Sequence, residues 1–142
     1  MKAIKYTPKE IDVEIANISL LTVKEAKALP ENIRRYVAGW WLQSPGYISF
    51  LASGVYNFGD VNINAYSVDD DDVCVRPAIT ISNARLKIGD IITIQNKKYV
   101  AIASNRVLYD DKVVYHRFDA STNDYDNSEI KKIVDEWLEG GK

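Results

Sequence analysis

Short stretches of alternating apolar and polar residues, separated by turn-forming residues, dominate the chain. Such alternation turns one face of a strand toward a core and the other toward solvent, and Val, Ile, Thr and Tyr favour strands. In the first stretch, Val13, Ile15 and Asn17 share a face. The predicted strands are Asp12–Leu21, Trp40–Leu42, Phe50–Tyr56, Val61–Tyr66, Val73–Ile81, Ile91–Ile94, Tyr99–Ala103, Arg106–Tyr109 and Lys112–Phe118.

Turn residues indicate how the later strands are joined. The polar residues Gln95–Lys98 predict a turn between two strands, and Asp110-Asp111 predict another, so we expect two hairpins in succession. Pro77 lies within the predicted strand Val73–Ile81 and has no N–H to donate. We therefore expect this strand at a sheet edge or with a bulge.

Two short helices are predicted near the N-terminus. Thr22 and Glu25 have the spacing of a capping box, in which each side chain accepts a hydrogen bond from an otherwise unpaired N–H. This box predicts a helix over Val23–Leu29 that ends at Pro30, which cannot continue it. A second helical turn is expected over Glu31–Val37.

The C-terminal segment shows the clearest helical period. Its apolar residues recur at spacings of three and four, at Ile130, Ile133, Val134, Trp137 and Leu138. Asp126 and Glu129 suggest a capping box at its start, and Gly140 is expected just after its end. The apolar stripe must pack on a sheet, so we expect an α+β fold with a mostly antiparallel sheet and one C-terminal amphipathic helix.

Composition narrows the class of protein. The 142 residues are 46% hydrophobic, enough for the core of one domain, and the net charge of −2 argues against binding nucleic acid through its phosphates. The single cysteine, Cys74, excludes an internal disulfide, and Met1–Glu10 lacks the apolar stretch of a signal peptide. No run of 18 apolar residues occurs. We therefore expect a cytoplasmic protein that does not bind membranes.

One set of motifs resembles a known family. Trp40–Gly46 reads W-W-L-Q-S-P-G and Val75–Ile79 reads V-R-P-A-I, with Gly59 in a turn between them. This order resembles an uncharacterised bacterial and phage domain family with a W-W-L-R-S-P-G and G-V-R-P-A signature, which is similar to the C-type-lectin-like architecture. Gln43 stands where that family has Arg, and Cys74 where it has Gly.

The second half of the chain resembles the segment that opens this family, although here it closes the chain. The resemblance rests on Lys87–Asp90, Tyr99–Ile102, Phe118-Asp119 and Ser128–Ile130. We interpret the order as a circular permutation within a single domain, 1–142, whose signature half is 1–86 and whose permuted half is 87–142. Permutation requires neighbouring termini. It therefore predicts that Val75–Ile81 and Ile91–Ile94 are adjacent strands.

Candidate catalytic and metal-binding groups are few. Asp69–Asp72 lack the alternating spacing that converges carboxylates on calcium, so a solvated turn is favoured over a cation site. His116 is the only histidine, and Cys74 sits in an apolar stretch where a buried, inert thiol is expected. One Cys and one His do not make a zinc site. We expect no metal, no cofactor and no enzymatic activity.

Aromatic residues are the best candidates for binding. Nine Tyr and three Trp are present, and Tyr and Trp make rigid anchors at binding surfaces. The candidate binding residues gather in the loop-rich middle of the chain, at Tyr47, Phe50, Tyr56, Phe58 and Tyr66. The alternative is that these rings pack within the core.

Three further residues are expected to be structural. Alternation puts Trp40 and Trp41 on opposite faces of a strand, which leaves one of them half exposed. Arg76, within an apolar strand, is expected to pair with loop carbonyls or with a carboxylate, for which Glu25 and Asp119 are candidates.

These features favour a non-enzymatic binding protein of phage or mobile-element origin. It would recognise a host protein or a small ligand through loops 46–72, as an inhibitor of a host defence system that either blocks a protein, in the manner of anti-CRISPR proteins, or sequesters a signalling molecule. The alternatives are a receptor-binding module of a virion or tail, and an enzyme of unknown class.

Overall fold

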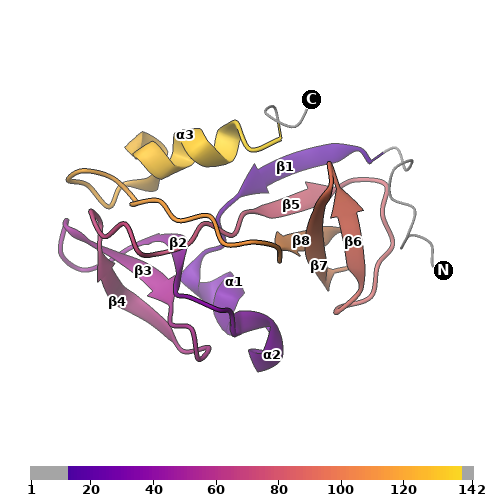
Figure 1. The fold of residues 1–142 in the computed structure, drawn as a ribbon, viewed down its shortest axis with the longest axis horizontal. Helices are drawn as coiled ribbons and strands as arrows, with labels where there is room; N and C mark the ends of the chain where they lie inside the picture. Colours follow the sequence, from indigo (N-terminus) through magenta and orange to yellow (C-terminus); the bar gives the residue numbers. More distant parts are fainter. Residues whose placement is uncertain (1–12, 139–142) are drawn as a thin grey trace.

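The computed structural model of the protein describes residues 13–138 and confirms an α+β fold (Figure 1). Its elements, in chain order, are β1 Ile15–Ser19, α1 Val23–Lys27, α2 Glu31–Arg34, β2 Trp40–Pro45, β3 Leu51–Val55, β4 Val61–Ser67, β5 Ala78–Ile81, β6 Ile91–Ile94, β7 Lys97–Ala103, β8 Arg106–Tyr109, the 3-10 helix η3 Tyr125–Asn127, and α3 Glu129–Asp135. Each of these strands lies within or overlaps a strand predicted from the sequence.

The strands form two antiparallel sheets. The larger has five strands in the order β1-β5-β8-β7-β6, and the smaller has three in the order β2-β3-β4. Helix α3 lies along β1 on one side of the molecule, while α1 and α2 lie on the other (Figure 1). The expected hairpin β6–β7 is present, and Gln95 and Asn96 form its turn with φ of 54° and 69°. The expected hairpin between Arg106–Tyr109 and Lys112–Phe118 is wrong, because Lys112–Phe118 forms no regular strand and β8 pairs with β7.

The core fills both faces of the five-stranded sheet. On β7, Tyr99 and Ala101 pack in one apolar cluster with the partly buried Trp137, while Val100 between them packs in another cluster with α1 and α2. This is the two-residue period of a strand that is covered on both sides. The side chain of Trp137 donates a hydrogen bond to the Tyr99 hydroxyl at 2.9 Å.

The predicted adjacency of Val75–Ile81 and Ile91–Ile94 is wrong. Strand β5 lies between β1 and β8, and among the described strands β6 pairs only with β7, at the far edge of the sheet. The successive antiparallel pairs β6–β7 and β7–β8 place β8, not β6, beside β5. The backbone N–H and C=O groups of β5 are therefore already paired on both sides.

Some predicted strands are shorter than expected, and one is absent. Of Val73–Ile81, only the last four residues form β5, and of Lys112–Phe118 none forms a regular strand. Cys74 instead makes two isolated bridges, a parallel one to Trp40 and an antiparallel one to Tyr115. Pro77 precedes β5, which is an interior strand, so the expected edge position is also wrong.

The capping box of α1 is confirmed. The backbone N–H of Glu25 donates to Thr22 Oγ1 at 3.1 Å, and the N–H of Thr22 donates to Glu25 Oε1 at 2.9 Å. The following helix α2 ends at Arg34, three residues before the expected Val37, because Arg35 has extended backbone angles.

The predicted capping box of α3 is wrong. Ser128, not Asp126, is its N-cap, and the Ser128 hydroxyl accepts from the N–H of Lys131. Glu129 instead pairs with Arg117. Gly140 lies outside the described residues. The helices found within residues 13–138 are too short and too polar to serve as membrane spans.

Candidate functional site: an exposed aromatic loop

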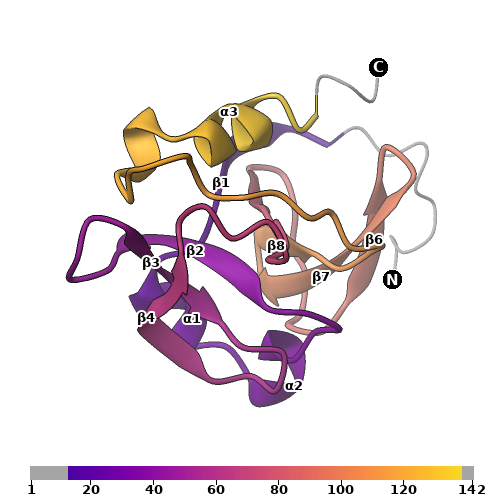
Figure 2. The same cartoon turned by 60° about the vertical axis from the view of Figure 1, so that its left-hand side comes forward.

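The loop between β2 and β3 carries exposed apolar side chains. Tyr47 is 81% exposed, Phe50 54% and Ile48 49%. We call residues 46–50 the tip, because this loop projects from the body of the molecule (Figure 2). Large apolar side chains that are exposed side by side are typical of interaction sites, because their contact with water is unfavourable.

Two asparagine side chains hold the tip in place. The Nδ2 group of Asn123 donates to the carbonyls of Gly46, Ile48 and Leu51 at 3.2, 3.0 and 3.0 Å. The N–H of Tyr47 donates to Asn64 Oδ1 at 2.8 Å. A Cβ atom at Gly46 would lie 2.6 Å from the Leu51 carbonyl oxygen, so this close approach requires glycine. The tip is therefore held in one conformation by atoms distant in the sequence.

The other predicted binding aromatics lie elsewhere. Phe58, 55% exposed, is in the turn at the opposite end of β3 from the tip, and its ring stacks on Tyr56 at 5.5 Å. Tyr56 meets Tyr66 edge to face at 5.5 Å, and Tyr66 meets Trp41 at 5.6 Å. Burial raises the pKa of Tyr66 to about 12. These rings connect the surface to the core, so the structure brings only Tyr47 and Phe50 of the five together at the tip.

Trp40 and Trp41 are both completely buried, which corrects the expectation that one of them is half exposed. They do point to opposite faces: Trp40 packs in the cluster beneath α1 and α2, and Trp41 in the cluster beneath α3. Trp40 donates its ring N–H to the Arg34 carbonyl at 3.0 Å, and Trp41 to the His116 carbonyl at 2.7 Å. Strand β2 is covered on both faces, since a layer of the protein lies on each side of it.

Arg76 is a buried structural cation, with 1% of its surface exposed. It donates to the carbonyls of Tyr109 and Ile33 at 2.8 and 3.1 Å, and pairs with Asp110 at 3.4 Å. Burial lowers its pKa to about 10, although the nearby Asp110 carboxylate opposes this. The expected carbonyl partners are confirmed, and Asp110 is a partner that sequence reasoning missed.

The two predicted carboxylate partners of Arg76 are wrong. Glu25 pairs with Arg106 at 2.7 Å. Asp119 accepts from the N–H groups of Ser121, Thr122 and Glu129 at 3.0–3.1 Å.

Cys74 and His116 do not form an activated pair. Burial raises the pKa of the Cys74 thiol to about 11, which disfavours the nucleophilic thiolate. Its side chain belongs to the core beneath α1 and α2. His116 Nδ1 lies 2.7 Å from the Arg117 carbonyl oxygen, so this ring nitrogen contacts backbone.

Residues 69–72, which we call the acidic turn, lie beside the tip. The N–H of Val68 donates to the Phe50 carbonyl at 2.9 Å, and Leu51 pairs with Ser67 at the end of β4. Carboxylate oxygens of the last three aspartates of the turn lie within 4.8 Å of one another. Asp70 Oδ1 accepts the N–H of Asp72, which stabilises the turn itself, and exposed acidic turns of this kind are common without a cation.

Two grooves open on the surface away from the tip. One, of about 380 Å³, is lined by Lys27, Arg34, Tyr56, Asp60, Val61 and Asn62. The other, of about 620 Å³, is lined by Arg35, Tyr36, Val37, Lys98, Asp110, Asp111, Lys112 and Val113. The guanidinium of Arg34 in the first groove donates to the carbonyls of Gly59 and Leu29, so it holds the backbone together. Tyr47 and Phe50 line neither groove.

Sequence reasoning missed Ile48, Asn64 and Asn123. Ile48 could have been found, because it lies between Tyr47 and Phe50 in a loop that begins with Pro-Gly. The roles of Asn64 and Asn123 could not be predicted from the sequence, since they depend on contacts made only after folding. No family model, curated protein or solved structure matches this chain.

Proposed function

We propose that the protein is a non-enzymatic binding protein that recognises a partner protein through the tip. The observation that carries this proposal is that Asn123 holds in one conformation the loop backbone that carries exposed Tyr47, Ile48 and Phe50. Exposing apolar side chains to water is unfavourable, and fixing the backbone that carries them beforehand reduces the entropy lost on binding. Exposed aromatic side chains are typical anchors of protein interfaces.

A protein partner is favoured over a small ligand. Small molecules bind in concave sites that bury most of their surface, whereas the tip projects from the molecule (Figure 2). A projecting apolar loop gains contact area only when it inserts between the side chains of a larger partner. Of the proposed functions, blocking a protein therefore fits the tip better than sequestering a signalling molecule.

The narrower proposal is that the partner belongs to a bacterial defence system and that the protein comes from a phage or mobile element. It is supported by the resemblance of Trp40–Gly46 and Val75–Ile79 to a family found in bacteria and phages. Blocking a protein partner needs an exposed surface that can contact it, and the tip offers one.

A comparative capture experiment tests the tip. The wild type, a Tyr47→Ser/Phe50→Ser variant and an Ile88→Ser variant are immobilised and exposed to bacterial lysate, and bound proteins and small molecules are identified by mass spectrometry. Ile88 is 59% exposed on the loop before β6, so its variant is the matched control. We expect proteins retained by the wild type and the control but lost by the tip variant. Equal capture by all three proteins would contradict the proposal.

A further inference from the structure

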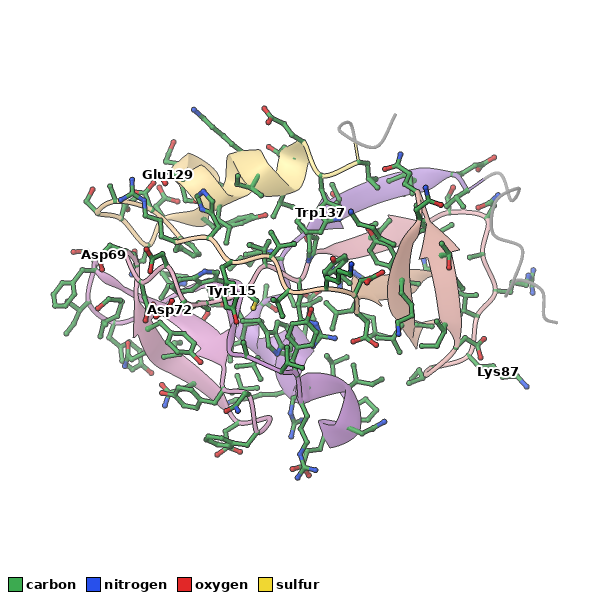
Figure 3. The ribbon with its side chains drawn as sticks, in the orientation of Figure 1. Asp69, Asp72, Lys87, Tyr115, Glu129 and Trp137 are labelled. Carbon is green, nitrogen blue, oxygen red and sulfur yellow. The ribbon has the colours of Figure 1, made fainter. Side chains whose placement is uncertain are left out.

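The surface around the tip is strongly acidic. The acidic turn follows β4 and lies beside the tip, and Asp124 follows Asn123, which holds the tip. In Figure 3, Asp69 and Asp72 lie at the same end of the molecule as Glu129, while Lys87 lies at the opposite end. The apolar side chains of the tip therefore lie close to several carboxylates.

Nearby cations offset only part of this charge, since Arg117 is close enough to Asp69 to interact with it electrostatically. Arg117 is engaged by both carboxylate oxygens of Glu129, at 2.8 and 2.7 Å. Neither the aspartates of the acidic turn nor Asp124 forms an ion pair with another residue in the part of the chain that the structure describes. If the tip were buried against an acidic or neutral partner surface, these carboxylates would approach that surface without any basic group to compensate their charge.

The negative charge near the tip also distinguishes between the classes of partner that could bind it. Anionic phospholipid headgroups and nucleic-acid phosphates would both be repelled by the acidic turn. A protein surface rich in Lys and Arg would be attracted, and such attraction speeds association and selects against acidic partners.

We infer that the occupant of the tip is a basic protein surface, in which an apolar hollow that receives Tyr47, Ile48 and Phe50 is bordered by Lys and Arg side chains. This inference rests on the proposed function, because it names the partner of the same site. The apolar anchors supply most of the affinity, and the carboxylates of the acidic turn and Asp124 supply the selectivity.

Selection from a random peptide display library tests the inference without a known partner. The library is selected in parallel on the wild type, on Tyr47→Ser/Phe50→Ser, and on Asp69→Asn/Asp71→Asn/Asp72→Asn. The last variant keeps Asp70, whose carboxylate accepts the N–H of residue 72, so the turn is preserved. We expect the wild type to enrich peptides with more Lys and Arg than the input library, binding about tenfold more weakly at high than at low salt.

The outcomes separate the two proposals. Loss of enrichment on the tip variant, together with loss of the Lys and Arg excess on the asparagine variant, supports the inference. A tip-dependent pool with no excess of Lys and Arg overturns the inference and leaves the proposed function standing. If no pool depends on the tip, the proposed function fails as well. Thermal unfolding of each variant shows that it is folded before selection.

Sedimentation of the wild type checks the remaining occupant, a second copy of the chain. We expect a monomer at every concentration. A dimer that forms with rising concentration and is abolished by Phe50→Ser would make a second copy the occupant and overturn the inference.

Discussion

The guanidinium carbon of Arg76 lies 4.6 Å from the centre of the Trp40 ring, and the ring of Tyr36 lies at 4.2 Å from the same atom. The cation is thus held between two aromatic rings and also donates to backbone carbonyls and to Asp110. Cation–π contacts gain strength in such a desolvated setting. This arrangement joins β2 to the segment before β5, where the two sequence motifs meet.

Removing this cation is expected to destabilise the protein strongly. Arg76→Ala leaves the Ile33 and Tyr109 carbonyls without their donor, so we expect the free energy of unfolding to fall by about 3–5 kcal/mol. Arg76→Lys keeps the charge but loses the planar guanidinium that stacks on the two rings and donates several hydrogen bonds. It should lower the free energy of unfolding by about 1–3 kcal/mol. Chemical denaturation measures both.

Arg35→Ala is the matched control. Arg35 pairs with Glu31 at 2.9 Å in an exposed i,i+4 pair, and its loss should cost less than about 0.5 kcal/mol. Equal costs at the two positions would show that Arg76 is not the structural cation described above.

Asn123→Ala is expected to release the tip. The substitution removes the donor to the carbonyls of Gly46, Ile48 and Leu51, and should lower the free energy of unfolding by about 1–2 kcal/mol. Hydrogen exchange at the Leu51 amide, which donates to the Ile48 carbonyl, should become about tenfold faster. Exchange measured by NMR follows this amide directly.

Asn57→Ala provides the comparison for Asn123. The Asn57 side chain is exposed and makes no hydrogen bond with another described residue, so exchange at Leu51 should be unchanged. An unchanged rate in Asn123→Ala as well would show that Asn123 does not order the tip.

Cys74 should resist thiol reagents in the folded protein. The side chain is fully buried and burial raises its pKa to about 11, so little thiolate is accessible at neutral pH. We expect an aromatic disulfide reagent to react at least about a hundredfold more slowly with the folded than with the denatured chain. A Ser49→Cys variant, with its thiol in the exposed tip, should react rapidly at the new position. Fast reaction of Cys74 in the wild type would contradict its placement in the core.

Asp119 should make stability depend on acid pH. Burial alone would raise its pKa, but hydrogen bonds from the N–H groups of Ser121, Glu129 and Thr122 outweigh this and hold the pKa below its ordinary value. A carboxylate with a lowered folded-state pKa stabilises the protein above its unfolded-state pKa. That stability is lost as the pH falls through the folded-state pKa.

Comparison with Asp119→Asn measures this contribution. At neutral pH we expect the variant to be less stable than the wild type by about 1 kcal/mol or more, and the difference to shrink below about pH 4. Asp126→Asn is the control, since its carboxylate makes no hydrogen bond with another described residue. A difference that stays constant between pH 7 and about pH 3 would exclude this role.

Local features could be predicted from the sequence because their interactions join residues close together in the chain. The Thr22–Glu25 capping box spans one helical turn, and the hairpin between β6 and β7 needs only the turn at Gln95 and Asn96. Apolar alternation likewise located most of the strands, because it depends on nothing beyond the two-residue period.

The prediction of an α3 capping box failed because two local signals competed. Asp126 and Glu129 have suitable spacing, but Ser128 lies closer to the first turn and η3 takes up residues 125–127. Glu129 instead pairs with Arg117, which lies 12 positions away and is not predicted by the spacing of residues within one helical turn. Competing local signals are therefore decided by the contacts that each side chain makes after folding.

By itself the sequence determined the fold class, most of the strands and the α1 cap, and its five candidate binding aromatics include Tyr47 and Phe50. Only the tertiary structure decided that β5 lies beside β8, that Trp40 and Trp41 are both buried, and that Asn123 holds the tip. Asn123 and Ile48 are 75 positions apart, and Arg76 and Asp110 are 34 apart. Contacts at such separations depend on how whole sheets pack, and neither local propensity nor periodicity contains that information.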